Sequence, residues 1–108
     1  MTKEDYKKAL YHLAVYRLNK FEIDEDVIIL ESYTRIGLGE EQVALYLMNN
    51  LLKENDTNYE AYLIRAKALR ALGKDGVKES LDRAVRYSAG TEDGEYIQET
   101  VKYLMDVR

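Results

Sequence analysis

At 108 residues the chain has the size of one domain, and its 46% hydrophobic and 33% charged residues are interspersed, which excludes a disordered chain. The absence of cysteine excludes disulfides, thiolate metal sites and cysteine nucleophiles. A net charge of -4 argues against a protein that mainly neutralises phosphates, so nucleic acid is not the expected partner. The sequence therefore predicts one folded domain, residues 1–108.

Targeting and membrane segments are not predicted. The N-terminal residues are charged and have no apolar segment behind them, and no run of about 18 apolar residues occurs. We therefore expect a protein that does not enter a membrane, and we expect it to be cytoplasmic.

Six helices are predicted, because apolar residues recur every three or four positions in six stretches separated by short turns. In chain order they cover residues 4–19, 25–36, 40–54, 58–72, 76–88 and 92–107. No stretch alternates apolar and polar residues as a half-buried strand does. Short connections favour antiparallel neighbours, so the expected fold is all-α, with six short helices stacked as about three helical hairpins.

Polar residues and glycines mark where the predicted helices begin and end. Side chains that can cap a helix start are Asp24, Asp75 and Thr91, together with a capping box formed by Thr57 and Glu60. Three helices are followed by a glycine, which can take the left-handed conformation that ends a helix. These glycines are Gly37, Gly73 and Gly90.

The width of each apolar face predicts which helices are central. Apolar residues cover most of the circumference of the third helix, 40–54, so we expect it to be the most buried. The fifth helix, 76–88, carries a single apolar stripe with charges elsewhere, which predicts a position on the outside of the domain.

The helices show an internal repeat with a period of thirty-four residues. Steps of this length relate Ala9 to Val43 and Val77, Leu13 to Leu47 and Leu81, and Tyr62 to Tyr96. A six-helix bundle with helices of equal length is the alternative explanation. The register of small and large residues in successive hairpins favours a repeat whose stacked units share one core.

The clearest repeat covers residues 58–88. Its first helix opens with a large residue and a small one four positions later, and its second helix carries a small, a large and a small residue. These residues are Tyr62, Ala66, Val77, Leu81 and Ala84. The pattern resembles the tetratricopeptide repeat (TPR), although Arg65 stands where that family has leucine and the proline after the second helix is missing. The resemblance implies a TPR-like right-handed solenoid of helical hairpins that binds other proteins.

The resemblance also implies where a ligand binds, because members of this family hold peptides along the surface made by the first helix of each hairpin. The corresponding residues here are Glu31, Thr34, Leu63, Lys67 and Arg70. Lys67 and Arg70 lie one helical turn apart and would together favour an acidic peptide. The lysine and asparagine pair that holds a terminal carboxylate in some family members is not reproduced, since Leu63 occupies the place of its first member.

The chain has ten tyrosines and no tryptophan. Most of them, including Tyr33, Tyr59, Tyr62, Tyr96 and Tyr103, fall on the apolar stripes, where core packing is the expected role. A recognition surface is the alternative, because tyrosine and arginine are frequent among binding hot spots.

No catalytic, cofactor or metal site is predicted, and we do not expect an enzyme. His12 is the only histidine, so a metal site or histidine-based catalysis would lack partners. The acidic run 24–26 is explained by a helix N-terminus, where carboxylates are favoured. The run Gly37-Leu38-Gly39 follows a predicted helix, whereas a phosphate-binding loop follows a strand.

The leading functional hypothesis is an interaction module or scaffold that binds a peptide or helix of a partner protein in a groove. The first alternative is a designed or recombined helical-repeat scaffold with no evolved ligand. The second is RNA binding by helical hairpins, which only the basic segment 65–86 supports. Self-association is expected if the end helices leave apolar residues uncovered. The residues concerned are Tyr11, Val15 and Leu18 at one end and Ile97, Val101 and Leu104 at the other.

Overall fold

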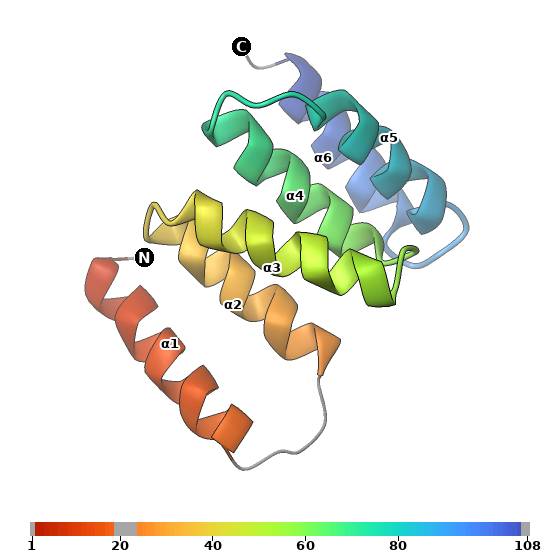
Figure 1. Ribbon diagram of the computed structural model, residues 1–108. Helices are drawn as coiled ribbons and strands as arrows, with labels where there is room; N and C mark the ends of the chain where they lie inside the picture. The colour runs from red at the N-terminus through yellow and green to blue at the C-terminus, as the bar shows by residue number, and fades with distance from the viewer. Residues whose placement is uncertain (1, 19–23, 107–108) are drawn as a thin grey trace.

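The computed structural model describes residues 2–18 and 24–106, which form helices joined by short connections (Figure 1). In chain order these are α1 (Lys3–Leu18), α2 (Glu25–Gly37), α3 (Glu41–Glu54), α4 (Tyr59–Ala71), α5 (Val77–Ser88) and α6 (Gly94–Asp106). Each boundary lies within two residues of the predicted one. No strand occurs in the described part of the chain, so the predicted all-α class with six helices is confirmed.

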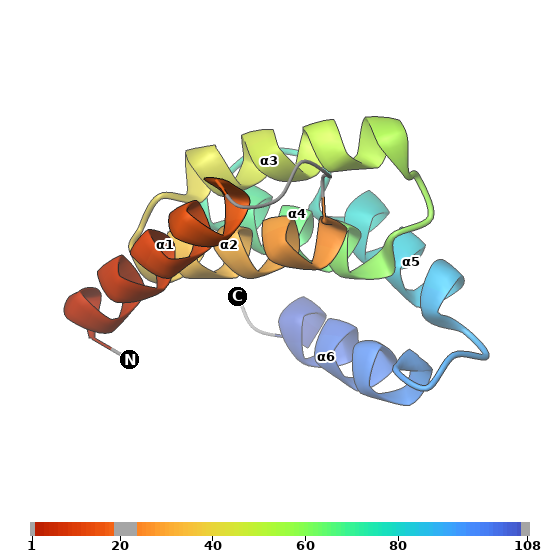
Figure 2. The ribbon, with the colours of Figure 1, turned by 90° about the horizontal axis from the view of Figure 1, so that it is seen from below.

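Each helix packs against the next one along the chain, and α2 also contacts α4. Figure 1 shows that α2, α4 and α6 run in the same direction, while α3 and α5 run in the opposite direction. In the second view α3 and α6 lie on opposite sides of α2 and α4 (Figure 2). The N-terminal ends of α2, α4 and α6 therefore lie along one edge of the molecule.

Among the described side chains, those of α4 are more buried than those of α3, so the prediction that the third helix is the most buried was wrong. In α3 only Ala44, Leu45, Met48 and Leu51 are buried, and two of its large residues, Val43 and Tyr46, are exposed to solvent. The buried residues of α4 are Ala61, Tyr62, Leu63, Ile64, Ala66, Ala68 and Leu69. Three of these are alanines, whose small side chains allow α2, α3 and α5 to approach α4 closely.

The core has two main parts, and both include α4. One lies between α4, α5 and α6 around Leu63, Leu81 and Ile97. The other lies between α2, α3 and α4 around Met48 and Ile64. The fifth helix packs as predicted, because α5 buries one stripe and exposes its charges. The buried residues are Ser80, Leu81, Ala84 and Ser88, and the exposed charges include Lys78, Asp82 and Arg86.

The predicted capping residues of α2 and α4 can be compared with the side chains that form the capping hydrogen bonds. Asp24 caps α2 as predicted, since its carboxylate accepts a hydrogen bond from a first-turn N–H at 3.0 Å. Asn58 caps α4 in the same way at 3.1 Å, in place of the predicted Thr57. Thr57 instead donates its hydroxyl hydrogen to the side chain of Asn55. Asparagine is as good a cap as threonine, and it stands one position closer to the helix.

The predicted caps of α5 and α6 are not formed. No side chain caps α5, because the residue before it is Gly76 in the left-handed conformation, with a φ of 103°. Helix α6 begins three residues after Thr91, whose hydroxyl donates to the Ser88 carbonyl oxygen at 2.6 Å and so closes the end of α5.

The glycines that end helices were predicted correctly at Gly73 and Gly90, which both take the left-handed conformation. Gly37 was predicted to follow α2 but is its last residue. The Tyr6 ring of α1 packs directly over Gly37 and occupies the space where a Cβ would lie. Gly37 therefore allows the close approach of α1 to α2.

Candidate functional site

Four side chains from α2, α4 and α6 lie close together on one side of α4: Tyr33, Glu60, Lys67 and Tyr96. We refer to them as the tyrosine face. The Lys67 ammonium nitrogen lies 5.3 Å from the centre of the Tyr33 ring. The Tyr33 hydroxyl is in turn close enough to Glu60 and Tyr96 for their charges to change its pKa. The parallel course of α2, α4 and α6 explains how residues from three helices meet here (Figure 1).

Lys67 is half-buried, and its charge faces an aromatic ring. Within the described residues no aspartate or glutamate lies within ion-pair distance of its ammonium group. Burial lowers the pKa of Lys67, because the charged form loses hydration. A partly dehydrated ammonium that has only a cation–π partner can still form a charge-assisted hydrogen bond with an incoming carboxylate.

Tyr33 lies beside Lys67, and the charge of Glu60 acts on its hydroxyl. Burial, followed by the charges of Glu60 and Tyr96, raises the pKa of Tyr33 to about 12. Its hydroxyl therefore stays protonated at neutral pH and can donate a hydrogen bond. The ring also supplies the electron-rich surface on which the Lys67 ammonium rests.

Glu60 marks an acidic end of the tyrosine face. Burial raises the pKa of Glu60, and the nearby carboxylates of Asp93 and Asp26 raise it further. Glu60 and Asp26 lie in the first turns of α4 and α2, and Asp93 directly precedes α6. In residues 24–106 no lysine or arginine forms an ion pair with any of these three carboxylates. Their positions at helix N-termini stabilise the helices.

Exposed rings and an aliphatic side chain extend the tyrosine face. Tyr96 is 64% exposed, and Tyr103, two turns later on the same side of α6, is 66% exposed. Leu30 lies one turn before Tyr33 on α2 and is 54% exposed. Core packing was the expected role of Tyr96 and Tyr103, and it is wrong for both residues. No described helix covers this side of α6, which a pattern within one helix cannot reveal.

Two of the predicted peptide-binding residues lie below the surface. Leu63 is 1% exposed and belongs to the core between α4, α5 and α6. Thr34 is buried and donates its hydroxyl hydrogen to the Leu30 carbonyl oxygen at 2.9 Å. Neither side chain can reach a surface ligand in this conformation. The helical register explains this, because α2 presents Leu30 and Tyr33 at the surface and turns Thr34 inward.

The other three predicted residues are half-buried at the surface. Lys67 is part of the tyrosine face, and Arg70 lies one turn beyond it on α4. Glu31 lies 4.0 Å from Arg35 on the same helix, within an ion pair that also involves Glu40. Lys67 contacts another member of the tyrosine face, the ring of Tyr33.

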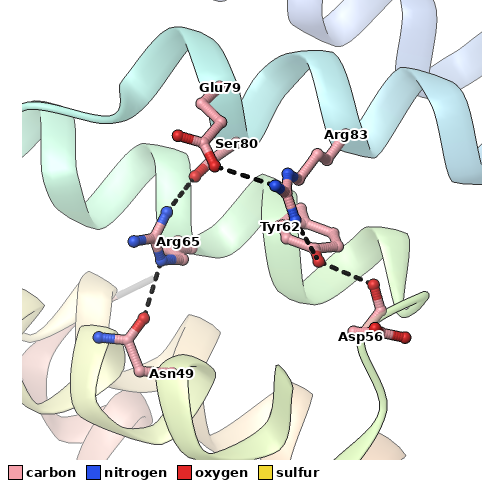
Figure 3. Close-up of polar contacts among 7 residues, drawn as sticks. All are labelled: Asn49, Asp56, Tyr62, Arg65, Glu79, Ser80 and Arg83. Carbon is pink, nitrogen blue, oxygen red and sulfur yellow. Dashed lines mark hydrogen bonds and ion pairs between the residues drawn. The ribbon is translucent and has the colours of Figure 1, made fainter. Parts of the chain in front are cut away.

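The opposite side of α4 is closed by hydrogen bonds between helices (Figure 3). Arg65 donates from Nε to Asn49 Oδ1 at 2.8 Å and from Nη1 to Ser80 Oγ at 2.5 Å. Arg65 thereby links α4 to both α3 and α5. These contacts explain how an arginine is accommodated where the resembling family has leucine.

Tyr62 lies on the same closed side (Figure 3). Its hydroxyl donates to the Asp56 carbonyl oxygen at 2.7 Å and accepts a hydrogen bond from Arg83 at 3.4 Å. Its ring stacks on Tyr87 with 5.7 Å between the centroids. Arg83 also pairs with Glu79 at 3.2 Å on α5. The polar groups of this side are thus used by the fold itself.

The residue types most often used in catalysis and metal binding are histidine and the acidic residues. His12 is exposed, and its ring lies edge-on to Tyr11 with 5.7 Å between the centroids. The part of the chain that the structure describes contains no group of three or more histidine or acidic side chains placed to hold a metal ion. None of the described helices combines the length and apolar character needed to cross a membrane.

Comparisons with known proteins add no relative. No protein-family model, no curated protein and no solved structure matches the chain. The resemblance to the tetratricopeptide repeat therefore depends on the quoted residues alone.

Proposed function

We propose that this protein is an interaction module that binds an acidic peptide or helix of a partner protein on the tyrosine face. The observation that supports this most directly is the half-buried ammonium of Lys67, which rests on the Tyr33 ring and has no carboxylate within reach among the described residues. The Lys67 ammonium is already partly dehydrated in the free protein. The desolvation penalty for an ion pair with a ligand carboxylate is therefore smaller than for a fully hydrated lysine. Arg70 supplies a second cation one turn away.

The composition of the surface supports the same proposal. Tyrosine and arginine are frequent at the centres of protein interfaces, where a large rigid ring buries area with little loss of conformational entropy. Tyr96, Tyr103 and Leu30 are large exposed side chains on the helices that form the tyrosine face. Single exposed apolar residues are normal on a protein surface, but a group of them beside a half-buried cation favours recognition.

We further infer that the helices form stacked hairpins of the tetratricopeptide type, in which α2, α4 and α6 correspond to one another. The contact between α2 and α4 and the packing of each helix on the next are those expected of such a stack. The repeat of thirty-four residues relates α3 to α5 and α4 to α6. In this arrangement the tyrosine face is the surface on which a repeat protein of this kind presents its ligand site.

A selection from a displayed random-peptide library tests the proposed function. The wild-type protein is compared with Lys67→Glu/Arg70→Glu. A matched control is Lys78→Glu/Arg86→Glu, which makes the same change in net charge on the exposed side of α5. We expect acidic peptides to be enriched on the wild type and on the control, and to be lost on Lys67→Glu/Arg70→Glu.

Circular dichroism and light scattering on all three proteins establish that each is folded and monomeric before the selection is read. Equal loss of enrichment on the control would show that only net charge matters and would contradict a site on α4. Absence of any enrichment on the folded wild type would contradict the proposal and favour a helical scaffold with no evolved ligand.

A further inference from the structure

We infer that the acidic segment bound on the tyrosine face also carries one cation in a fixed order, with this cation at Glu60, a carboxylate at Lys67 and an apolar side chain between them. This inference rests on the proposed function and specifies the chemistry of its ligand.

The distance between the two charges follows from the helix that carries them. Glu60 and Lys67 are seven residues apart on α4, which places them on the same side of the helix, about 10 Å apart along its axis. Both are only partly exposed, and neither forms an ion pair with another described residue. A negative and a positive anchor are therefore held at a fixed separation on one rigid element.

The negative anchor has neighbours of its own sign. The carboxylates of Asp26 and Asp93 act on Glu60 from α2 and from the turn before α6. Glu60 is partly buried while Asp26 and Asp93 are exposed, and a cation bound at Glu60 would relieve the repulsion that these two like charges exert on it. The Asp93 carboxylate accepts a hydrogen bond from the Tyr59 hydroxyl at 2.7 Å, which holds one wall of this end in place.

The positive anchor lies at the other end of the series. Lys67 has an aromatic partner and no acidic one among the described residues, and Arg70 follows it toward the C-terminal end of α4. Helix C-termini are electronegative, so cations there also favour the helix, but the half-burial of Lys67 goes beyond that role. A carboxylate of the ligand is the group that fits this end.

The surface beside the positive anchor is aromatic. The Tyr33 ring lies 5.3 Å from the Lys67 ammonium nitrogen, and the charges of Glu60 on α4 and Tyr96 on α6 both act on the Tyr33 hydroxyl. An apolar ligand side chain would be in contact with these rings while its charged neighbours reach the two anchors. In an extended peptide a separation of about 10 Å corresponds to three residues, and in a helix it corresponds to two turns.

A reversal of both anchors tests the order of the charges. The variant Glu60→Lys/Lys67→Glu keeps the net charge of the protein and exchanges the two ends of the tyrosine face. Its matched control, Lys78→Glu/Asp82→Lys, makes the same exchange of signs on the exposed side of α5. Each protein is used in a selection from a displayed peptide library in which lysine and glutamate occur with equal frequency at every position.

We expect the wild type and the control to enrich peptides in which lysine and glutamate occur in one preferred order, and the reversed variant to enrich the opposite order. A second variant, Glu60→Gln, avoids the placement of a lysine in a partly buried position. It should weaken binding of a selected peptide about fivefold, the equivalent of about 1 kcal/mol for one partly exposed charge pair. Replacement of the peptide's lysine by alanine should then have little further effect on this variant.

The inference and the proposed function fail in different ways. If the wild type enriches peptides whose charges have no preferred order, or if the reversed variant keeps the wild-type order, the inference is wrong and the proposed function stands. If no peptide is enriched on the folded wild type, both are wrong. If light scattering shows a wild-type dimer that the reversed variant lacks, the occupant is a second copy of the chain, and the inference is also wrong.

Discussion

The two sides of α4 treat their charged residues in opposite ways. On the side toward α3 and α5, Arg65 donates hydrogen bonds to Asn49 and Ser80, and its charge belongs to a network between helices (Figure 3). On the side toward α2 and α6, Lys67 lies over the ring of Tyr33, and no acidic side chain of the described residues pairs with it. Two cations that are two residues apart in sequence thus have different roles. The difference is that neighbouring helices offer hydrogen-bond acceptors to Arg65, whereas the described neighbour of Lys67 is an aromatic ring.

The tyrosines of the two sides differ in the same way. Tyr62 and Tyr96 are separated by one repeat of thirty-four residues, yet Tyr62 is 5% exposed and Tyr96 is 64% exposed. Tyr62 is covered by α5, where Arg83 and Tyr87 contact it. No described helix covers Tyr96 in the corresponding way. The same residue type at equivalent positions of the repeat is therefore buried in one helix and exposed in the other.

The largest expected effect is the difference in unfolding free energy between a substitution at a buried residue of α4 and one at an exposed residue of α6. Leu63→Ala should lower the free energy of unfolding by about 2 to 5 kcal/mol, because it leaves a cavity in the core between α4, α5 and α6. Tyr96→Ala should change it by less than about 0.5 kcal/mol, as exposed substitutions usually do. Urea denaturation followed by circular dichroism measures both. A large loss for Tyr96→Ala would contradict its assignment to the surface.

The closed side of α4 should be sensitive to the loss of one hydrogen-bond partner. Arg65→Ala should cost about 1 to 3 kcal/mol, since it leaves the fully buried Ser80 hydroxyl without its partner. The double variant Arg65→Leu/Ser80→Ala removes both polar groups. Its loss of unfolding free energy should be clearly smaller than the sum of the losses for Arg65→Leu alone and Ser80→Ala alone. A double-mutant cycle in urea measures the coupling, and additive effects would contradict the described network.

The pKa of Tyr33 predicts a dependence of stability on alkaline pH. The pKa is about 12 in the folded protein and about 10 in the unfolded chain, so the unfolded state loses its proton first. The free energy of unfolding should then fall as pH rises above 10, by up to about 1.4 kcal/mol per pH unit from this residue, until pH 12. Tyr33→Phe should show a smaller decrease over this range. An identical decrease in wild type and variant would contradict the burial of the Tyr33 hydroxyl.

The smallest expected change in stability is that of Lys67→Met. A half-buried ammonium without a carboxylate partner contributes little to the fold, and methionine has a similar length, so the variant should be within about 1 kcal/mol of the wild type or slightly more stable. The same variant should bind a selected acidic peptide at least tenfold more weakly. Titration calorimetry measures the binding. Destabilisation equal to that of Arg65→Ala would show that Lys67 is structural and would remove the contrast between the two sides.

The sequence predicted the elements of the fold well, because each helix is encoded locally. All six helices were placed within two residues, and Asp24 was identified as a cap, since periodicity and capping depend on residues close in the chain. The central position of α4 was missed. It depends on alanines that allow neighbouring helices to approach, and a count of large apolar residues favours α3 instead.

The candidate site was predicted only in part. Lys67 and Arg70 were identified from the repeat register, and the structure places both at the surface. Thr34 and Leu63 were included on the same basis but are buried, because a register derived from sequence does not fix the rotation of a helix about its axis. Tyr33, Glu60 and Tyr96 come from three different helices, so their proximity is a property of the fold. The side chains of Val15 and Leu18 lie outside the described residues. Ile97 and Val101 would favour self-association if they were exposed at the other end, but both are buried.

The most direct test of the central claim is a nuclear magnetic resonance titration of the ¹⁵N-labelled protein with a peptide selected on the wild type. We expect the largest chemical-shift changes at Tyr33, Lys67 and Tyr96, with the signals of Arg65 and Ser80 unchanged. Changes concentrated around Arg65 and Ser80, with the tyrosine face unaffected, would contradict the claim that the peptide binds on the tyrosine face.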